Sequence, residues 1–267
     1  MRDKHIVHGF TAVDNQPDPR FWVTVLDKTC RDPFCIAYKT RVKELLDPRP
    51  GGVYLDVGAG TGFDARAIIN NVPATVMALD LSQTLMAEAI SRGLLNCIVG
   101  DVVSLPFKNN SFDGCWADRL FQHLAHPHTA LDEIIRVTKP GGRIVIVDPD
   151  YDTQVMEFPD QELARRVFRF RAEVGLRNGA IAHRMPAMFA ARGLTQVQVE
   201  SMTRIINDPA AADNVMGLRT WARSAMSLDW FTEDEVLRWE ELYDEVVAAQ
   251  RFMWSVTFFI TTGIKPE

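Results

Sequence analysis

The chain has 267 residues, of which 47% are hydrophobic and 24% are charged, and its net charge is -6. This composition is ordinary for a soluble globular protein and argues against a long phosphate-binding track for nucleic acid. No run of eighteen apolar residues occurs, so we expect no transmembrane helix, and the opening residues lack the apolar stretch of a signal peptide. We therefore expect a cytoplasmic protein with four reduced cysteines.

The first fifty residues predict a helical segment that precedes the main domain. Apolar spacing indicates helices around 21–28 and 36–46, with Pro17, Pro19 and Pro48 near their boundaries. We expect residues 1–50 to form a separate helical unit and residues 51–267 to form the main domain.

Residues 53–148 alternate between short apolar strands and helices. Strands are predicted at 53–57, 75–80, 96–101, 111–118 and 143–148, and helices at 64–72, 82–93 and 128–137. This alternation indicates βαβ units and a parallel sheet that is buried on both faces. Because such crossovers are right-handed, the carboxyl ends of these strands should meet at one edge of the sheet.

Beyond Asp148 the pattern changes to longer helices and two further strands. Helices are predicted at 160–175, 181–193 and within 209–250, and strands at 194–202 and 252–264, the last of them antiparallel. Thr232 and Glu235 form a capping box at the start of one helix. The expected fold is α/β: a Rossmann-like, mostly parallel sheet of seven strands with helices on both faces. Helical cap insertions are expected at about 149–192 and 202–251.

The first predicted strand ends in the glycine-rich turn Gly58-Ala59-Gly60-Thr61-Gly62. In an open α/β sheet, ligands bind at such a turn. Dinucleotide sites read G-x-G-x-x-G and bind a pyrophosphate at a helix N-terminus. Here the glycines occupy every second position, and Asp56 precedes the first of them by two residues. A carboxylate repels a diphosphate and attracts an ammonium group, so the turn favours a ligand with a cationic end.

Two further acids end the next two strands. Asp80 stands where a carboxylate can accept both hydroxyls of a ribose. Asp101 stands where it could accept a proton from an adenine amino group, while the N–H of Val102 serves a ring nitrogen. Leu81, Met86 and Val102 could enclose the ring. A ligand with an ammonium group, a ribose and an adenine but no phosphate is S-adenosylmethionine.

Four motifs in order resemble those of class I S-adenosylmethionine-dependent methyltransferases, in the methyltransferase-11 or ubiquinone/menaquinone-methyltransferase-like branch. They are VYLDVGAGTG, VMALDLS, IVGDVVSLPFKNNSFDGCWADRLFQHL and EIIRVTKPGGRIVIVD, and they lie between residues 53 and 148. The resemblance implies methyl transfer from S-adenosylmethionine, with S-adenosylhomocysteine as the product.

The resemblance also assigns residues to parts of the cofactor. It implies that the turn from Gly58 to Gly62, with Ala59 and Gly60, borders the amino-acid part of the cofactor. Asp118 and Arg119, after the fourth strand, should lie near the sulfonium. The N-terminal segment should form a lid over the cofactor, closed by Tyr38 and Lys39.

Two missing motifs narrow the acceptor. Amino-methyltransferases of nucleic acids and proteins often carry N/D-P-P-Y/F after the fourth strand, where this chain reads ADRLFQHL, and quinone C-methyltransferases typically read LEF where it reads VDPDYD. A small, largely apolar or aromatic acceptor remains, with O- or N-methylation favoured and natural-product tailoring as the context. Its pocket should use some Met and aromatic residues of the added segments, although each alone reads more simply as core. These are Trp22, Phe168, Phe170, Met185, Met188, Phe189, Trp221, Met226, Trp230 and Phe231.

The candidates for a general base stand at strand ends. They are His123 after the fourth strand and Asp148, Asp150 and Tyr151 after the fifth. His123 could equally be a structural hydrogen-bonding residue, because QHL is common in this branch. The grouping of His123, His126 and His128 beside a proline reads as a solvated turn, so we predict no metal site.

Three alternatives stay open at this point. They are a C-methyltransferase of the quinone or lipid type, a nicotinamide-dependent oxidoreductase, and a non-catalytic protein that binds S-adenosylmethionine. Asp56, the glycine spacing and the absence of a Tyr-x-x-x-Lys pair disfavour the oxidoreductase. The expected partner is a small-molecule acceptor, with no nucleic acid and no membrane span, and a homodimer is left open.

Overall fold

The structure is a computed structural model, and it describes residues 9–267 apart from the side chains of 214–216 and 227. Most of the opening stretch on which the expectation of no signal peptide rests lies outside the described residues. No helix in the described part is long and apolar enough to cross a membrane.

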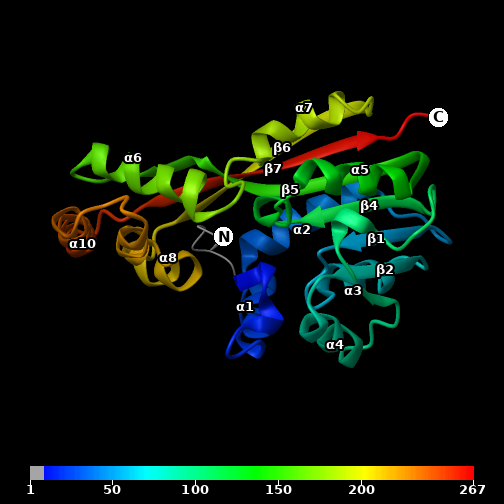
Figure 1. Cartoon of the computed structure of the whole chain (residues 1–267), viewed down its shortest axis with the longest axis horizontal. Coiled ribbons are helices and arrows are strands. Elements are labelled where there is room, and N and C mark those ends of the chain that lie inside the picture. Colours follow the sequence, from blue (N-terminus) through cyan, green and yellow to red (C-terminus); the bar gives the residue numbers. More distant parts are fainter. Residues whose placement is uncertain (1–8) are drawn as a thin grey trace.

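A seven-stranded sheet forms the centre of the molecule, in the order β3-β2-β1-β4-β5-β7-β6 (Figure 1). The strands are β1 Val53–Val57, β2 Thr75–Asp80, β3 Cys97–Val99, β4 Phe112–Asp118, β5 Thr138–Met156, β6 Thr195–Ile206 and β7 Trp254–Ile264. The first five strands pair in parallel, and β7 is antiparallel to both β5 and β6. The Rossmann-like, mostly parallel α/β sheet predicted from the sequence is therefore confirmed.

Helices cover both faces of this sheet. On one face, α2 (Pro33–Leu46), α3 (Phe63–Ile69) and α4 (Gln83–Ser91) share a core with strand residues that include Val145. On the other, α5 (Pro127–Val137) and α7 (Met185–Ala190) pack on residues that include Leu55. Because both faces are buried, the central strands read as nearly continuous apolar runs in the sequence.

The part of the N-terminal segment that precedes α2 contacts the domain through α4. Helix α1 (Arg20–Arg31) precedes α2, and Asp27 accepts two hydrogen bonds from Arg92, at 2.6 and 2.8 Å. The carboxylate of Asp14 accepts from the backbone N–H groups of Gln83 and Thr84, at 2.7 and 3.0 Å. Asp14 thereby supplies acceptors to the otherwise unpaired first turn of α4.

Strand β5 is longer than the sequence predicted. It runs eight residues beyond Asp148, and Pro149, Asp150, Val155 and Met156 pair with β7 between Trp254 and Phe258, with a shift in register between Asp150 and Val155. A proline has no N–H to donate and is therefore unexpected inside a strand. Pro149 is tolerated because β4 stops pairing with β5 at Val147, so no β4 carbonyl opposite Pro149 needs that N–H. Likewise β6 continues to Ile206, so the two insertions begin later than residues 149 and 202.

The inserted helices form a cap on the extended ends of β5, β6 and β7. They are α6 (Gln161–Phe170), the π-helical turn η5 (Arg171–Gly175), α8 (Pro209–Met216), α9 (Trp221–Ala225) and α10 (Glu233–Ala248). In Figure 1 the labelled cap helices α6, α8 and α10 lie at the left, beyond the ends of β1 to β4. The predicted capping box is present, with Thr232 and Glu235 bonded reciprocally at the start of α10.

Most aromatic and Met residues proposed for the acceptor pocket serve as core instead. Phe168, Phe170, Trp221 and Phe231 are buried within the cap. Met185, Met188 and Phe189 pack α7 against the sheet. The reason is simple: a cap of several short helices needs a core of its own, and large side chains at helical spacing supply it.

Candidate functional site

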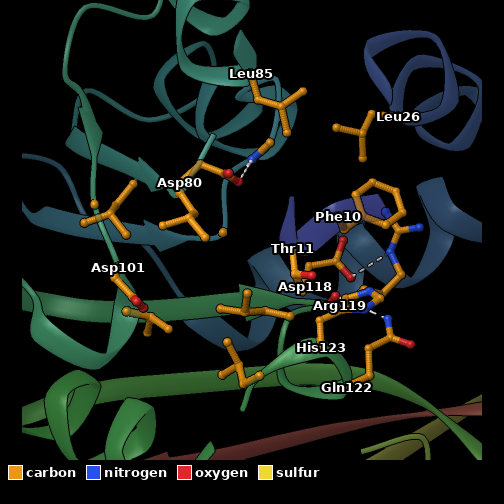
Figure 2. A pocket seen from close by; sticks show the side chains of 18 residues that line it. Phe10, Thr11, Leu26, Asp80, Leu85, Asp101, Asp118, Arg119, Gln122 and His123 are labelled. Atoms are coloured by element: carbon orange, nitrogen blue, oxygen red, sulfur yellow. Dashed lines mark hydrogen bonds and ion pairs between the residues drawn. The ribbon is translucent and has the colours of Figure 1, made fainter. Parts of the chain in front are cut away.

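A cavity of about 870 Å³, including its open mouth, lies at the carboxyl ends of the parallel strands (Figure 2). Figure 2 shows Asp80, Asp101, Asp118 and Arg119 around it, and Leu26 entering from α1. Its walls therefore combine polar side chains from the ends of three strands, β2, β3 and β4, with apolar side chains from the N-terminal segment.

The glycine turn after β1 has two distinct parts. Gly58 and Gly60 line the cavity with positive φ angles of 74° and 55°. A Cβ at Gly58 would meet Leu120 of the turn after β4, and a Cβ at Gly60 would meet Leu26 of the N-terminal segment. Gly62 lines neither this cavity nor the smaller one described below. A Cβ at Gly62 would lie 2.6 Å from Cδ2 of Leu94. The position of Gly62 thus favours helix packing over the predicted contact with the cofactor.

Asp80 is held firmly at the cavity wall. Its Oδ2 accepts from the backbone N–H of Gly60 and its Oδ1 accepts from that of Ser82, both at 2.9 Å. Burial raises the pKa of this carboxyl, although the two backbone hydrogen bonds oppose that effect. Each carboxylate oxygen keeps a further lone pair, which suits a pair of ribose hydroxyls.

The predicted adenine contacts lie at the same cavity with one exception. Asp101, Leu81 and Val102 line it, and Oδ1 of Asp101 accepts from the N–H of Val103 at 3.1 Å. Met86 is instead buried in the core between α4 and the sheet, away from the cavity wall. Helix α4 turns this side chain inward, while Leu85 from the preceding position lines the cavity.

A smaller cavity lies behind the glycine turn and shares Leu26, Gly58, Gly60, Asp118 and Arg119 with the main one. Asp56 and Ala59 line this smaller cavity. The Oδ2 atom of Asp56 is buried and accepts no hydrogen bond from the described residues. Burial, together with the negative charge of Asp64, raises the pKa of Asp56 well above its usual range. A buried carboxylate oxygen without a donor suits a cationic ligand group, as the ammonium of S-adenosylmethionine would be.

A charged network closes the site from the side of α2. The ammonium group of Lys39 contacts the carboxylates of both Asp64 and Asp118, and the hydroxyl of Tyr38 donates to Asp118 at 3.1 Å. Burial alone would lower the pKa of Lys39, but the two carboxylates hold it well above its usual range. Burial would raise the pKa of Asp118, but Lys39 and Arg119 lower it. The pair is therefore charged on both sides.

Tyr38 and Lys39 differ in how near they come to a ligand. Lys39 lines the smaller cavity, whereas Tyr38 is fully buried and lines neither. Arg119 lines both, with a positive φ of 53°, and its Nε lies 3.4 Å from Oδ1 of Asp118. A non-glycine residue in this conformation is uncommon and often marks a functional position.

Of the four base candidates, His123 lines the main cavity and the other three do not. Asp148 is buried beneath the turn η4 (Phe121–His123) and accepts from the N–H groups of Phe121 and Gln122 at 3.2 and 3.3 Å. Asp150 is buried and accepts from the N–H and Nδ1 of His183, at 2.9 and 2.7 Å. Tyr151 is buried under the cap. The extension of β5 carries Asp150 and Tyr151 past the cavity, and the hydrogen bonds to η4 keep Asp148 beneath the turn.

His123 and its neighbours bring together distant parts of the chain. The ring of Phe10 lies 5.6 Å from the ring of His123, and Arg177 donates to the carbonyl of His123 at 3.2 Å. His126 and His128 are exposed at the start of α5. A different set, Asp150, Asp152 and His183, has potential donor atoms within 4.8 Å of one another, but both oxygens of Asp150 already accept hydrogen bonds.

Several residues of the cavity wall were not predicted from the sequence. They are Phe10, Thr11, Leu26, Leu79, Leu85, Gly100, Leu120, Gln122 and Leu124. Gly100 and Gln122 adjoin the predicted residues Asp101 and His123, which was a usable signal. Leu79, Leu85, Leu120 and Leu124 also adjoin predicted residues, but an apolar side chain at a cavity wall looks the same in sequence as one in the core. Leu26 has no predicted neighbour.

Known proteins with similar sequences and structures agree with this geometry. The family model described as a methyltransferase domain (Methyltransf_11) matches residues 55–146. An uncharacterized 37.1 kDa protein in transposon TN4556 of Streptomyces fradiae is 31% identical over 247 residues, which cover 90% of this chain and 70% of that protein.

A quinone enzyme and a solved structure match more narrowly. The ubiquinone/menaquinone biosynthesis C-methyltransferase UbiE of Cereibacter sphaeroides is 31% identical over 119 residues, covering 42% of this chain and 48% of that protein. The match thus spans about half of that enzyme. The YcgJ protein of Bacillus subtilis has the same fold, with a TM-score of 0.60, 21% identity and coverage of 87% of this chain and 99% of that one. The chain belongs to the class I S-adenosylmethionine-dependent methyltransferases.

Proposed function

We propose that this methyltransferase methylates an oxygen or nitrogen atom of a small, largely apolar or aromatic organic acceptor, with natural-product tailoring as its context. The observation that carries the proposal is the juxtaposition of Asp80, Asp101 and the unpaired buried oxygen of Asp56 around one glycine turn. In that arrangement Asp80 would hold the ribose, Asp101 and Val102 the adenine, and Asp56 the ammonium group.

When bound, S-adenosylmethionine supplies a methyl carbon whose bond to sulfur breaks, with the electron pair staying on sulfur, as the acceptor's lone pair forms the new bond. The chain's own task is to align the acceptor and exclude water. We propose that His123 takes the acceptor's proton, because it is the base candidate that reaches the cavity. Asp148 would act as a positioning residue, since it holds the backbone of the turn that carries His123.

We also propose that residues 1–50 act as the lid of the site. Phe10, Thr11 and Leu26 line the cavity, and Lys39 lines the smaller one. A lid of this kind excludes water from the reacting atoms. The alternative of a C-methyltransferase of the quinone type has one observation in its favour, the match to UbiE over 119 residues.

Calorimetry tests the cofactor site. The wild-type chain should bind S-adenosylmethionine and not a nicotinamide dinucleotide. Asp80→Ala should weaken this binding at least about tenfold, or about 1.4 kcal/mol. Asp132→Ala is the matched control, because Asp132 is exposed and contacts Arg192 on the surface of α5. Unchanged affinity in Asp80→Ala would contradict the assignment of the site.

A panel of acceptors with methyl-labelled cofactor then tests the reaction. Transfer to a hydroxyl or amine, located by mass spectrometry of fragments, supports the proposal, and transfer to a ring carbon supports the quinone-type alternative. Binding of the cofactor without transfer to any acceptor would favour a non-catalytic role. His123→Gln should lower kcat more than it changes cofactor affinity, and an unchanged kcat would rule out His123 as the base.

A further inference from the structure

Arg171 occupies an unusual position at the start of the π-helical turn η5. Its guanidinium lies between two aromatic rings, 5.2 Å from the ring centre of Tyr151 and 4.8 Å from that of Trp221. Its Nε atom is buried and has no hydrogen-bond acceptor among the described residues. π-Helical turns are rare and frequently occur at functional sites.

The other arginines of residues 9–267 make this position distinctive. Arg166, one turn earlier, also lies over an aromatic ring, that of Phe231 at 5.0 Å, but it is paired with Glu235. The arginines for which no carboxylate or carbonyl partner is found are otherwise exposed: Arg31, Arg165, Arg184 and Arg251. Arg119 also has a buried Nε that makes no hydrogen bond, but that atom lies 3.4 Å from Oδ1 of Asp118. Among residues 9–267, Arg171 is thus the partly buried arginine with neither a carboxylate nor a carbonyl partner.

The chemistry of the guanidinium group indicates which kind of hydrogen-bond acceptor Arg171 lacks. It is always charged in proteins and presents five N–H donors in a rigid fork. The rings of Tyr151 and Trp221 stabilise its charge through their faces but accept no directed hydrogen bond from the edge of the fork. A carboxylate matches that edge with two parallel hydrogen bonds. The arrangement therefore suits a planar anion that approaches from outside the described side chains.

A short segment links this arginine to the turn that carries His123. The backbone N–H of Asn178 donates to the carbonyl of Gln122 at 3.0 Å, and the N–H of Tyr151 donates to the carbonyl of Gly179 at 2.8 Å. Gly179 lies so close to η5 that a Cβ would be 2.6 Å from the carbonyl oxygen of Ala172. Arg171 and Tyr151 line neither cavity, but the backbone of residues 178–179 connects the segments that carry them to Gln122 of the main cavity wall.

We infer that Arg171, with Tyr151 and Trp221 as its aromatic walls, binds the carboxylate of an organic acid, and that this carboxylate is the recognition group of the methyl acceptor. The acceptor role rests on the proposed function, whereas binding of a carboxylate at Arg171 does not. Arg171 is a specificity residue in this scheme and takes no part in the breaking or forming of bonds.

The test is a titration of the protein, saturated with S-adenosylhomocysteine, with benzoate and with uncharged benzyl alcohol, followed by ligand-observed NMR. Benzoate should bind saturably and benzyl alcohol should bind at least tenfold more weakly. Arg171→Gln should weaken benzoate binding at least tenfold, and Arg171→Lys should weaken it less because the charge remains without the fork. Arg166→Gln, the matched control in the preceding helix α6, should bind benzoate like the wild type.

Equal binding of benzoate by the wild type and Arg171→Gln would overturn the inference, as would equal binding of benzoate and benzyl alcohol or no saturable benzoate binding. If Arg171→Gln does not fold, the inference is still tested by the Arg171→Lys variant and by the comparison of benzoate with benzyl alcohol in the wild type. These measurements need no turnover, so their failure is distinguishable from failure of the calorimetric test on Asp80. In an acceptor panel, acids should show a raised KM in Arg171→Gln while neutral acceptors keep theirs.

Discussion

Lys39 of α2 and Asp118 at the end of β4 form an ion pair in the interior, although 79 residues separate them in the chain. The same ammonium group contacts Asp64 of α3. This arrangement joins the N-terminal segment to the strand end that borders both cavities. Its charged state follows from mutual stabilisation, because burial alone would discharge each partner.

Replacement of the lysine should therefore be costly. Lys39→Met leaves two buried carboxylates with reduced compensation and should lower the free energy of unfolding by about 3–5 kcal/mol. Arg41→Met, on the same helix, removes ion pairs with Glu44 and Glu200 in which all side chains are well exposed, and it should cost much less stability than Lys39→Met. Urea denaturation of both variants provides the measurement, and equal losses would contradict the role assigned to Lys39.

Cofactor binding should depend on pH through Asp56. Its pKa in the free protein is raised by burial, so part of the population carries a proton at pH values between 3.8 and the raised value. An ammonium group favours the carboxylate, so binding should release this proton, and affinity should increase as pH rises through that range. Asp56→Asn should bind more weakly and lose the part of the pH dependence that belongs to Asp56, while any part from the raised pKa of Asp80 remains.

Calorimetry in buffers with different ionisation enthalpies measures the released proton directly. The Asp80→Ala variant is a useful comparison, because it should weaken binding while the proton release that belongs to Asp56 persists. A wild-type protein that binds the cofactor with no net proton exchange at any pH in this range would show that Asp56 does not meet the ammonium group.

The anchor of the N-terminal segment should control cofactor exchange. Asp14 accepts hydrogen bonds from Ser82, Gln83 and Thr84 at the start of α4, four residues after Phe10 of the cavity wall. Asp14→Ala should speed dissociation of the cofactor several-fold and cost about 1 kcal/mol of stability. Stopped-flow displacement gives the rate. Asp18→Ala is the control, because Asp18 bonds only the nearby N–H of Arg20.

The same contacts of Asp14 determine how its contribution to stability changes with pH. Burial would raise the pKa of Asp14, but the hydrogen bonds from Thr84 and Ser82 outweigh it and lower the pKa below 3.8. The stabilisation by Asp14 is therefore fully present above pH 3.8 and is lost as the pH falls through the lowered pKa. If the cofactor dissociated faster after a change of pH near neutrality, the titrating group would have to be another residue than Asp14.

Two glycines with similar backbone angles should respond differently to alanine. Gly62 and Gly93 have φ of 70° and 90°, but a Cβ at Gly62 would meet Leu94 at 2.6 Å, whereas one at Gly93 has nothing within 4 Å. Gly62→Ala should cost about 1–3 kcal/mol more than Gly93→Ala because of this overlap. The double variant Gly62→Ala/Leu94→Ala should lose less than the sum of the two single changes. Strict additivity would show that Leu94 is not the obstacle.

The sequence alone determined the sheet and the cofactor. Asp80 and Asp101 end parallel strands, and parallel strands with right-handed crossovers bring those ends to one edge whatever the rest of the chain does. The spacing of Gly58, Gly60 and Asp56 is likewise a local property. These predictions needed no knowledge of contacts between distant segments.

The tertiary structure decided which side chains at that edge face the ligand. His123, Asp148 and Asp150 all stand at predicted strand ends, yet β5 continues past Asp148. Asp150 is then buried against His183, and Tyr151 is buried in the core shared with the cap. Phe10 and Leu26 reach the cavity because the N-terminal segment packs on α4. A periodic pattern reports that a residue is buried, but what buries it depends on pairing between segments far apart in sequence, and that is a property of the whole fold.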